Sequence, residues 1–242
     1  MQTAGSFVTH PQTISYRLKP SPAMRFLVIF SLFFLTACSP ALNKRNILVI
    51  GDSNGAGKGW VYQFQELRGG GPLVNTAIGG NTFGFNGMGE LRRNTLENLT
   101  AYLRKGYAEM GSIDEILISL GTNDCKAEYA DRRDEPARHL ATLLSRTKAF
   151  FSERGQEVPR IVLITPPAAG GDAAVSEEFK GVKQCLRELS DQIRATAAAE
   201  GLCLVDFQRE PGEELLRFTR DGIHFDEQGY KLLAEAVAAG CY

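Results

Sequence analysis

The sequence predicts an α/β fold, a single domain in which a parallel sheet of about five strands lies between two layers of helices. The first observation is that short apolar runs alternate with longer amphipathic stretches along most of the chain. The second is that no Pro- or Gly-rich linker interrupts this alternation. Strands and helices in strict alternation form βαβ units with right-handed crossovers, which place helices on both faces of the sheet. The prediction is therefore a three-layer αβα sandwich.

The apolar runs expected to be strands are 47–50, 73–77, 113–120, 160–165 and 202–207. The stretches expected to be helices are 59–68, 91–109, 135–154, 176–200 and 227–239. In the helix predicted for 135–154, leucine and phenylalanine recur at helical spacing on one face, which indicates core packing and not a ligand site. His139 in that helix is expected to lie at the surface or at the boundary of the core. Asp226 is expected to cap the last helix.

Composition excludes several classes of partner. The formal net charge is −1, with 43% hydrophobic and 23% charged residues. A nearly neutral chain gives no electrostatic reason to expect nucleic acid or an anionic membrane surface as a partner. The length is sufficient for one full hydrophobic core.

The first 45 residues differ from the rest of the chain. Phe26–Leu35 is a nearly unbroken apolar run, preceded by Arg25 and followed by small residues and Cys38. A basic start with a short apolar run predicts a secretory signal, and the run is too short to span a bilayer. Leu35-Thr36-Ala37-Cys38 resembles the lipobox of bacterial lipoproteins, in which the cysteine becomes the lipid-modified first residue.

The expected organisation follows from this start. Residues 1–37 are expected to be a leader and signal peptide, with Met24 as the expected true start; residues 38–45 are expected to be a lipidated tether, and residues 46–242 the folded domain. The resemblance implies a protein of the bacterial cell envelope whose only membrane contact is the lipid on Cys38. With Ser39 after the cysteine, the resemblance also implies sorting to the outer membrane, with the domain facing the periplasm or the cell surface.

Export also affects the cysteines. With Cys38 lipidated, Cys125, Cys185, Cys203 and Cys241 remain for an oxidising compartment. Four cysteines allow three pairings, and the sequence does not choose among them or exclude free thiols. Their scattered spacing argues against a zinc site.

The residues that indicate chemistry lie near both ends of the domain. Ser53, in Gly51-Asp52-Ser53-Asn54, follows the buried strand predicted for 47–50. It therefore lies at the carboxyl edge of the sheet, where open α/β sheets bind ligands. A serine hydroxyl needs a base to take its proton, and the base needs an orienting partner. Asp221-Gly222-Ile223-His224 supplies both groups on one short segment.

Two more motifs are expected at the same edge. Asn75–Thr82 follows the second predicted strand, and Gly121-Thr122-Asn123-Asp124 follows the third. Glycine lets a backbone N–H approach a ligand closely, and an asparagine amide donates hydrogen bonds. Together with the Ser53 N–H, these groups suit the oxyanion of a tetrahedral intermediate.

These four motifs, in this order, resemble the SGNH (GDSL-type) hydrolase superfamily over about 46–239. The resemblance implies a flavodoxin-like fold, Ser53 as the nucleophile, His224 as the general base and Asp221 as the residue that orients it. It also implies that the N–H of Gly80 and the amide of Asn123 complete the oxyanion hole with Ser53. Asn54 departs from the name-giving motif, which has leucine there, and this bears on the subfamily more than on the chemistry.

Other interpretations fit less well. Taken alone, Asp52 and Asn123 would be turn residues. Gly51–Gly55 satisfies the Gly-x-Ser-x-Gly pattern of α/β-hydrolases, but the serine follows the first strand and no His-Gly-Gly-Gly loop precedes it. A P-loop is excluded because Asp52 occupies its first glycine position and Gly59 replaces its Ser or Thr.

The sequence therefore predicts a serine esterase that forms an acyl-serine intermediate and needs no metal or organic cofactor. The expected substrate is a small-molecule or carbohydrate ester with a short acyl group, with O-acetyl favoured. Small residues in 165–171 are expected to form a wall of the pocket. An envelope O-acyltransferase with the same triad and a catalytically silent binding lipoprotein are the alternatives. The sequence fixes neither the natural substrate nor the oligomeric state.

Overall fold

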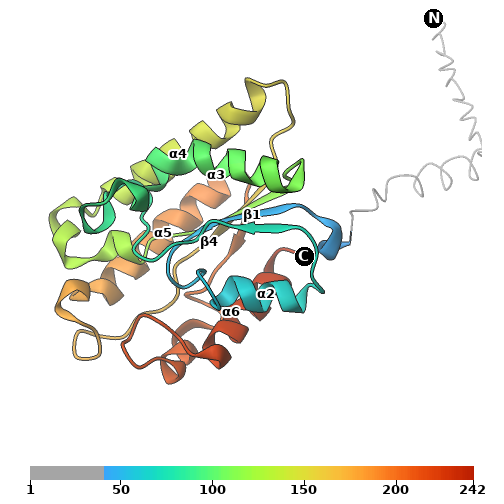
Figure 1. Cartoon of the computed structure of the whole chain (residues 1–242). Coiled ribbons are helices and arrows are strands. Elements are labelled where there is room, and N and C mark those ends of the chain that lie inside the picture. The colour runs from blue at the N-terminus through green and yellow to red at the C-terminus, as the bar shows by residue number, and fades with distance from the viewer. Residues whose placement is uncertain (1–40) are drawn as a thin grey trace, which may run out of the picture. The chain divides into compact units, whose positions relative to one another are not determined.

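The computed structural model describes residues 41–242, which form a five-stranded parallel sheet with helices on both faces (Figure 1). The order of strands in the sheet is β2-β1-β3-β4-β5. Their bounds are β1 Ile47–Gly51, β2 Leu73–Asn75, β3 Glu115–Ser119, β4 Arg160–Ile164 and β5 Cys203–Val205. The predicted fold class is confirmed. The residues expected to form the signal peptide, together with Met24 and Cys38, lie outside the described residues, so their roles remain predictions.

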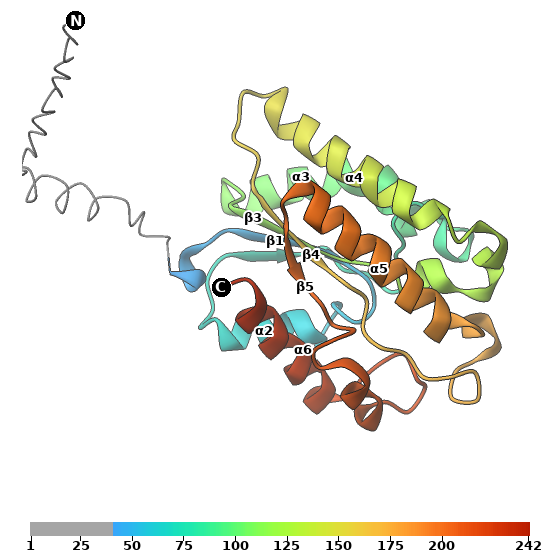
Figure 2. The ribbon, with the colours of Figure 1, turned by 180° about the vertical axis from the view of Figure 1, so that it is seen from behind.

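The five long helices form the outer layers. They are α2 Trp60–Leu67, α3 Thr95–Met110, α4 Glu135–Ser152, α5 Val182–Glu200 and α6 Glu227–Gly240. The helices α3, α4 and α5 cover one face of the sheet, and α2 and α6 cover the other (Figures 1 and 2). In the part of the chain that the structure describes, no helix combines the length and apolarity that crossing a membrane requires.

Alternating strand residues explain the two cores. In β1, Leu48 and Ile50 pack into the core under α3, α4 and α5, whereas Ile47 and Val49 pack into the core under α2 and α6. Successive side chains of a strand point to opposite faces, so an unbroken apolar strand is required when both faces are covered.

Several elements are shorter than the sequence predicts. The strand expected to end at residue 77 ends at Asn75, because residues 76–82 turn away as a loop. The helices expected to begin at 91 and 176 begin at Thr95 and Val182, each preceded by a short 3-10 turn. Asn94 explains the first start, since its side chain accepts a hydrogen bond from the Glu97 N–H as an N-cap. Asp226 caps α6 as predicted, accepting from two backbone N–H groups.

The amino edge of the sheet is closed by a buried carboxylate. Glu115, at the start of β3, is 1% exposed and lies 2.9 Å from the guanidinium of Arg160. It also contacts Arg45 and accepts a hydrogen bond of 2.6 Å from the hydroxyl of Tyr242. This cluster ties the first described segment and the C-terminus to the sheet, at the edge opposite Ser53.

The structure pairs the four cysteines in two disulfides. Cys125 pairs with Cys185, with a Cα–Cα distance of 5.7 Å, and Cys203 pairs with Cys241, at 6.2 Å. The first joins the loop after β3 to α5, and the second joins β5 to the end of the chain. The sequence left this choice open, because pairing depends on which Cα atoms the fold brings within bonding range.

Candidate active site

The parallel sheet brings the ends of distant segments to one edge. Ser53 follows β1 and Asn123 follows β3, and these two strands are neighbours in register from Ile47 with Glu115 to Gly51 with Ser119. The chain proceeds from β1 outward to β2 and then returns to β3, so the strand order reverses between β1 and β3. Open α/β sheets bind ligands in the crevice at such a switch point.

The three residues predicted to form a triad are joined in a chain of hydrogen bonds in which His224 lies between Ser53 and Asp221. His224 Nε2 is 2.9 Å from the hydroxyl oxygen of Ser53, and His224 Nδ1 is 2.7 Å from Asp221 Oδ2. The carboxylate accepts the Nδ1–H, which leaves Nε2 of the neutral ring free to accept the proton of the Ser53 hydroxyl. This geometry joins residues 171 positions apart in the sequence.

The turn between Asp221 and His224 holds the carboxylate in this orientation. Asp221 Oδ1 accepts hydrogen bonds from the backbone N–H groups of Ile223 and His224, at 2.9 and 2.8 Å. Burial opposes ionisation here, but these N–H groups and the imidazole outweigh it and lower the pKa of Asp221 to about 2. The group is therefore a carboxylate throughout the neutral range, as the partner of an imidazole must be.

The predicted oxyanion donors flank Ser53. Within residues 41–242, the N–H groups of Ser53 and Gly80 donate to no protein acceptor. The Asn123 side chain, 4% exposed, donates one amide hydrogen to the carbonyl of Asn81 at 3.1 Å. Its second amide hydrogen remains for another acceptor. Unpaired N–H groups at a site edge are suited to bind a developing negative charge.

A buried residue without a role in the sequence prediction fixes this loop to β1. Asn81 is fully buried, and its side-chain amide donates to the carbonyl of Gly51 at 2.9 Å. Its side-chain oxygen accepts from the Thr95 hydroxyl at 3.2 Å, at the start of α3. The Asn81 side chain thus links the Gly80 loop to the strand that carries Ser53. The residue lies in a motif the sequence singled out, but nothing in that motif indicates which asparagine is structural.

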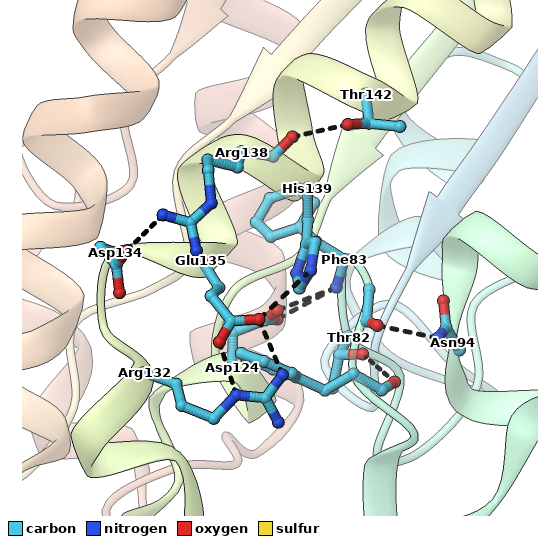
Figure 3. A network of polar contacts seen from close by, with 12 residues as sticks. Thr82, Phe83, Asn94, Asp124, Arg132, Asp134, Glu135, Arg138, His139 and Thr142 are labelled. Atoms are coloured by element: carbon cyan, nitrogen blue, oxygen red, sulfur yellow. Dashed lines mark hydrogen bonds and ion pairs between the residues drawn. The ribbon is translucent and has the colours of Figure 1, made fainter.

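A second buried residue links the loop that follows Gly80 to the turn that carries Asn123. The carboxyl group of Asp124 accepts the Phe83 N–H at 3.0 and 3.2 Å, as Figure 3 shows. Burial raises the pKa of Asp124 to about 8, with the Phe83 N–H opposing the shift and Asp52 adding to it. Asp52, the neighbour of Ser53 in the chain, accepts the Asn54 N–H at 3.0 Å, and burial raises its pKa to about 6. Carboxyl groups with raised pKa values are common at functional sites.

The protonated state of Asp124 predicts a pH dependence of stability. Its pKa in the folded chain lies far above the 3.8 of a free aspartate, so near neutrality the folded state holds a proton that the unfolded state releases. The free energy of unfolding therefore falls as pH rises, by up to about 1.4 kcal/mol per pH unit between about pH 6 and 7.5. We expect Asp124→Asn to remove this slope in urea titrations, whereas Asp131→Asn, at an exposed position, leaves it unchanged. Identical slopes in all three proteins would refute the assignment.

His139 is confirmed as a boundary residue. Its side chain is 19% exposed and lies 3.8 Å from Glu135, which also binds Arg132 (Figure 3). The ring packs edge-on against Phe85, and a methyl group at Gly84 would meet it at 2.5 Å. This histidine therefore supports the loop beyond Gly80 and is not part of the triad.

The predicted pocket wall is different from the one observed. A pocket of about 370 Å³ lies beside the triad and is lined by Arg217, Phe218, Thr219, Arg220, Asp221, His224, Phe225 and Asp226. Residues 165–170 are buried instead, and the Gly170 N–H donates to the carbonyl of Gly222 at 2.9 Å. Their small side chains allow this close packing, since a methyl at Gly170 would come within 3.2 Å of the Gly222 Cα. The segment therefore packs against the Asp221–His224 turn and supports it.

Comparison with known proteins identifies the family. The model of the GDSL-like Lipase/Acylhydrolase family matches residues 47–232. The chain belongs to this family. It is thus an ester hydrolase of the SGNH type, as the four motifs predict. A search of curated proteins finds no match. In the described residues, no group of three or more His, Cys, Asp or Glu side chains is placed to hold a metal ion.

Solved structures of esterases share the fold of this GDSL-family chain. A carbohydrate acetylesterase from Sinorhizobium meliloti has a TM-score of 0.67 at 22% identity, covering 81% of this chain and 97% of its own. An aryl esterase from M. smegmatis has a TM-score of 0.65 at 23% identity, covering 81% and 99%. A lipase/acylhydrolase from Enterococcus faecalis has a TM-score of 0.55 at 22% identity, covering 80% and 93%.

Proposed function

We propose that the protein is a serine esterase that hydrolyses short-chain acyl esters, O-acetyl groups on carbohydrate above all, through an acyl-serine intermediate. The observation that carries the proposal is the chain of hydrogen bonds from Ser53 through His224 to Asp221. A hydroxyl, an imidazole and a carboxylate in this order constitute a general-base-activated nucleophile.

In the proposed first half-reaction, the Ser53 oxygen attacks the ester carbonyl while His224 Nε2 takes the hydroxyl proton. The Asp221 carboxylate stabilises the imidazolium that forms. The N–H groups of Ser53 and Gly80 and the Asn123 amide bind the oxyanion of the tetrahedral intermediate, and each such donor is worth about 2.7–4 kcal/mol of barrier. The intermediate collapses when the alcohol leaves with the proton from His224, and the acyl group stays on Ser53.

The second half-reaction repeats these steps with water. His224 takes a proton from the attacking water, the same N–H groups bind the second oxyanion, and the carboxylic acid leaves as Ser53 regains its proton. Each proton that His224 takes is returned within the same half-reaction, so these steps balance with the ester and water as the only reactants. An alcohol in place of the water would give acyl transfer, so the acceptor decides between esterase and transferase.

Two features support a short acyl group on a polar alcohol. The pocket beside His224 is lined by arginine, threonine and aspartate together with Phe218 and Phe225. Polar groups with an aromatic face suit a sugar better than a fatty chain. A carbohydrate acetylesterase is among the proteins with the same fold, and this resemblance of fold agrees with the proposed substrate class.

The proposal predicts a steep dependence on acyl length. We expect kcat/KM for p-nitrophenyl acetate to exceed that for the octanoate ester at least tenfold, since each added methylene must find room near Ser53. Acetate release from an acetylated oligosaccharide, measured beside both, tests the alcohol part. Preference for octanoate would contradict the short-acyl proposal, and acetylated product in excess of free acetate when a sugar acceptor is added would make the protein a transferase.

A further inference from the structure

The segment Gly87–Arg93 is built around Gly80, the predicted oxyanion donor. The Thr82 N–H donates to the carbonyl of Arg93 at 3.0 Å, which holds the two segments side by side. The backbone of Gly87 packs so closely on the Gly80 carbonyl that a side chain at 87 would collide with it. Gly80 itself has φ 76°, a left-handed conformation that glycine adopts without strain. The segment therefore determines the orientation of the Gly80 peptide.

The guanidinium of Arg93 lies directly against Gly80. A methyl group at Gly80 would meet Arg93 Nη1 at 2.5 Å and Arg93 Cδ at 3.0 Å. The Arg93 side chain is only 15% exposed. Arginine side chains are seldom buried to this extent unless they are paired with an acceptor. Its Nε donates to Glu90 Oε2 at 3.2 Å, and Nη1 contacts the sulfur of Met88. The charge is thus held in one place and not free to sample solvent.

Met88 is strained and exposed at once. Its φ of 55° is the single positive φ of a non-glycine residue between residues 41 and 242. Such a conformation is energetically unfavourable for a residue with a side chain. The side chain is 57% exposed, so burial in the core does not offset this cost. In this conformation the Met88 sulfur contacts Arg93 Nη1.

The segment Gly87–Arg93 carries a net positive charge. Glu90 is the one carboxylate that binds Arg93, and it also binds Arg92, so two positive charges share one negative charge. The Arg92 side chain is 70% exposed, whereas that of Arg93 is covered by Gly80 and Met88. Positive charge held beside a forming oxyanion is worth much more than the same charge in water, because the site excludes part of the solvent.

We propose that Arg93 is a positioning residue of the oxyanion hole: it fixes the Gly80 peptide and adds positive potential where the oxyanion forms. This inference rests on the proposed function, because it takes Gly80 as an oxyanion donor. The sequence gives no signal for it, since Arg93 lies outside the four motifs. Its effect belongs to the transition state, so it changes kcat more than KM.

The adjacent arginines provide a matched test. Arg93→Met keeps the length of the stem and removes the charge, Arg93→Lys keeps a charge, and Arg92→Met removes the exposed neighbour on the same carboxylate. With p-nitrophenyl acetate, we expect Arg93→Met to lower kcat about tenfold with KM within about twofold. Arg93→Lys should recover at least half of that loss in logarithmic terms, and Arg92→Met should stay within about twofold of the wild type.

A boronic acid gives a readout that a packing defect would not move in the same way. Phenylboronic acid forms a tetrahedral, negatively charged adduct on an active serine, so its inhibition constant should rise by the same factor as kcat falls. Circular dichroism melting of the full chain checks that each variant folds; if Arg93→Met does not, Arg93→Lys decides, with kcat expected within about threefold of the wild type.

The outcomes are distinct. The inference is overturned if Arg93→Met matches the wild type, if the Met and Lys variants lose kcat and boronate affinity equally, or if Arg92→Met loses as much as Arg93→Met. If the wild type is active through Ser53 but one of these three outcomes is found, only the role of Arg93 is refuted and the proposed function stands. A wild type that neither hydrolyses esters nor binds the boronic acid refutes the proposed function, and the inference falls with it.

Discussion

Replacing Ser53 with alanine is expected to lower kcat for p-nitrophenyl acetate by roughly 10⁴- to 10⁶-fold, with the fold and melting temperature unchanged. The reason is geometric, because the Ser53 oxygen is the one group that His224 Nε2 contacts at 2.9 Å. Without it, the N–H groups of the oxyanion hole can still polarise the carbonyl, but no acyl-enzyme forms. The measurement is steady-state hydrolysis by wild type and variant prepared in parallel.

The control is a serine of the same chain that lies away from the site. Ser145 is exposed on α4, and Ser145→Ala should retain full activity. A fluorophosphonate should label the wild type and Ser145→Ala but not Ser53→Ala, with the adduct on Ser53 by mass spectrometry. Activity that survives in Ser53→Ala would show that another nucleophile or a direct attack by water operates.

The triad also predicts a pattern of non-additivity. His224→Ala should cost nearly as much as Ser53→Ala, and the double variant should lose little more than either, since both residues act in one proton transfer. Asp221→Asn should cost less than either, because it changes the tautomer and orientation of the imidazole without removing the base. Independent, additive losses would mean that these three residues do not act as a unit.

The positions of the candidate site residues were largely predictable because these residues follow strands or share one tight turn. Ser53 lies two residues after β1 and Asn123 four residues after β3, and in a parallel sheet such positions share one edge. His224 was identifiable because a base and its carboxylate three residues apart suit a single tight turn. The placement of Ser53 and Asn123 at one edge and the pairing of Asp221 with His224 follow from the order of strands and turns. Neither requires knowledge of side-chain packing.

What the sequence could not supply depends on three-dimensional packing. The segment 165–171 suggested a pocket wall from its small residues, but whether small residues border a cavity or allow close contact depends on what lies opposite, here Gly222. Arg93 is unremarkable in the sequence and gains its role from the fold of residues 80–82 against it. The raised pKa of Asp124 follows from complete burial, which the Gly-x-Asn-Asp motif does not encode.

The two disulfides offer the second large effect, and they should separate stability from activity. Cys125–Cys185 closes a loop of 60 residues and Cys203–Cys241 one of 38. By chain entropy, each should stabilise the folded state by about 4 kcal/mol, because the unfolded chain loses similar freedom in both cases. We expect the paired alanine replacements to lower the free energy of unfolding by comparable amounts, measured by urea denaturation under non-reducing conditions.

Activity should distinguish them, because the two disulfides lie at different places relative to the site. Cys125 is in the same short turn as Asn123 and Asp124, so its bond to α5 holds the donor amide in place. Cys203 and Cys241 join β5 to the end of the chain, near the amino edge of the sheet, away from Ser53. At a temperature where both variants are folded, Cys125→Ala/Cys185→Ala should lose about tenfold in kcat, since small displacements of a catalytic donor are costly. Cys203→Ala/Cys241→Ala should stay near the wild type. If Cys125→Ala/Cys185→Ala keeps the kcat of the wild type, the Asn123 turn is held by its other contacts, the Asn81 carbonyl and the Phe83 N–H, and the disulfide beside it serves stability alone.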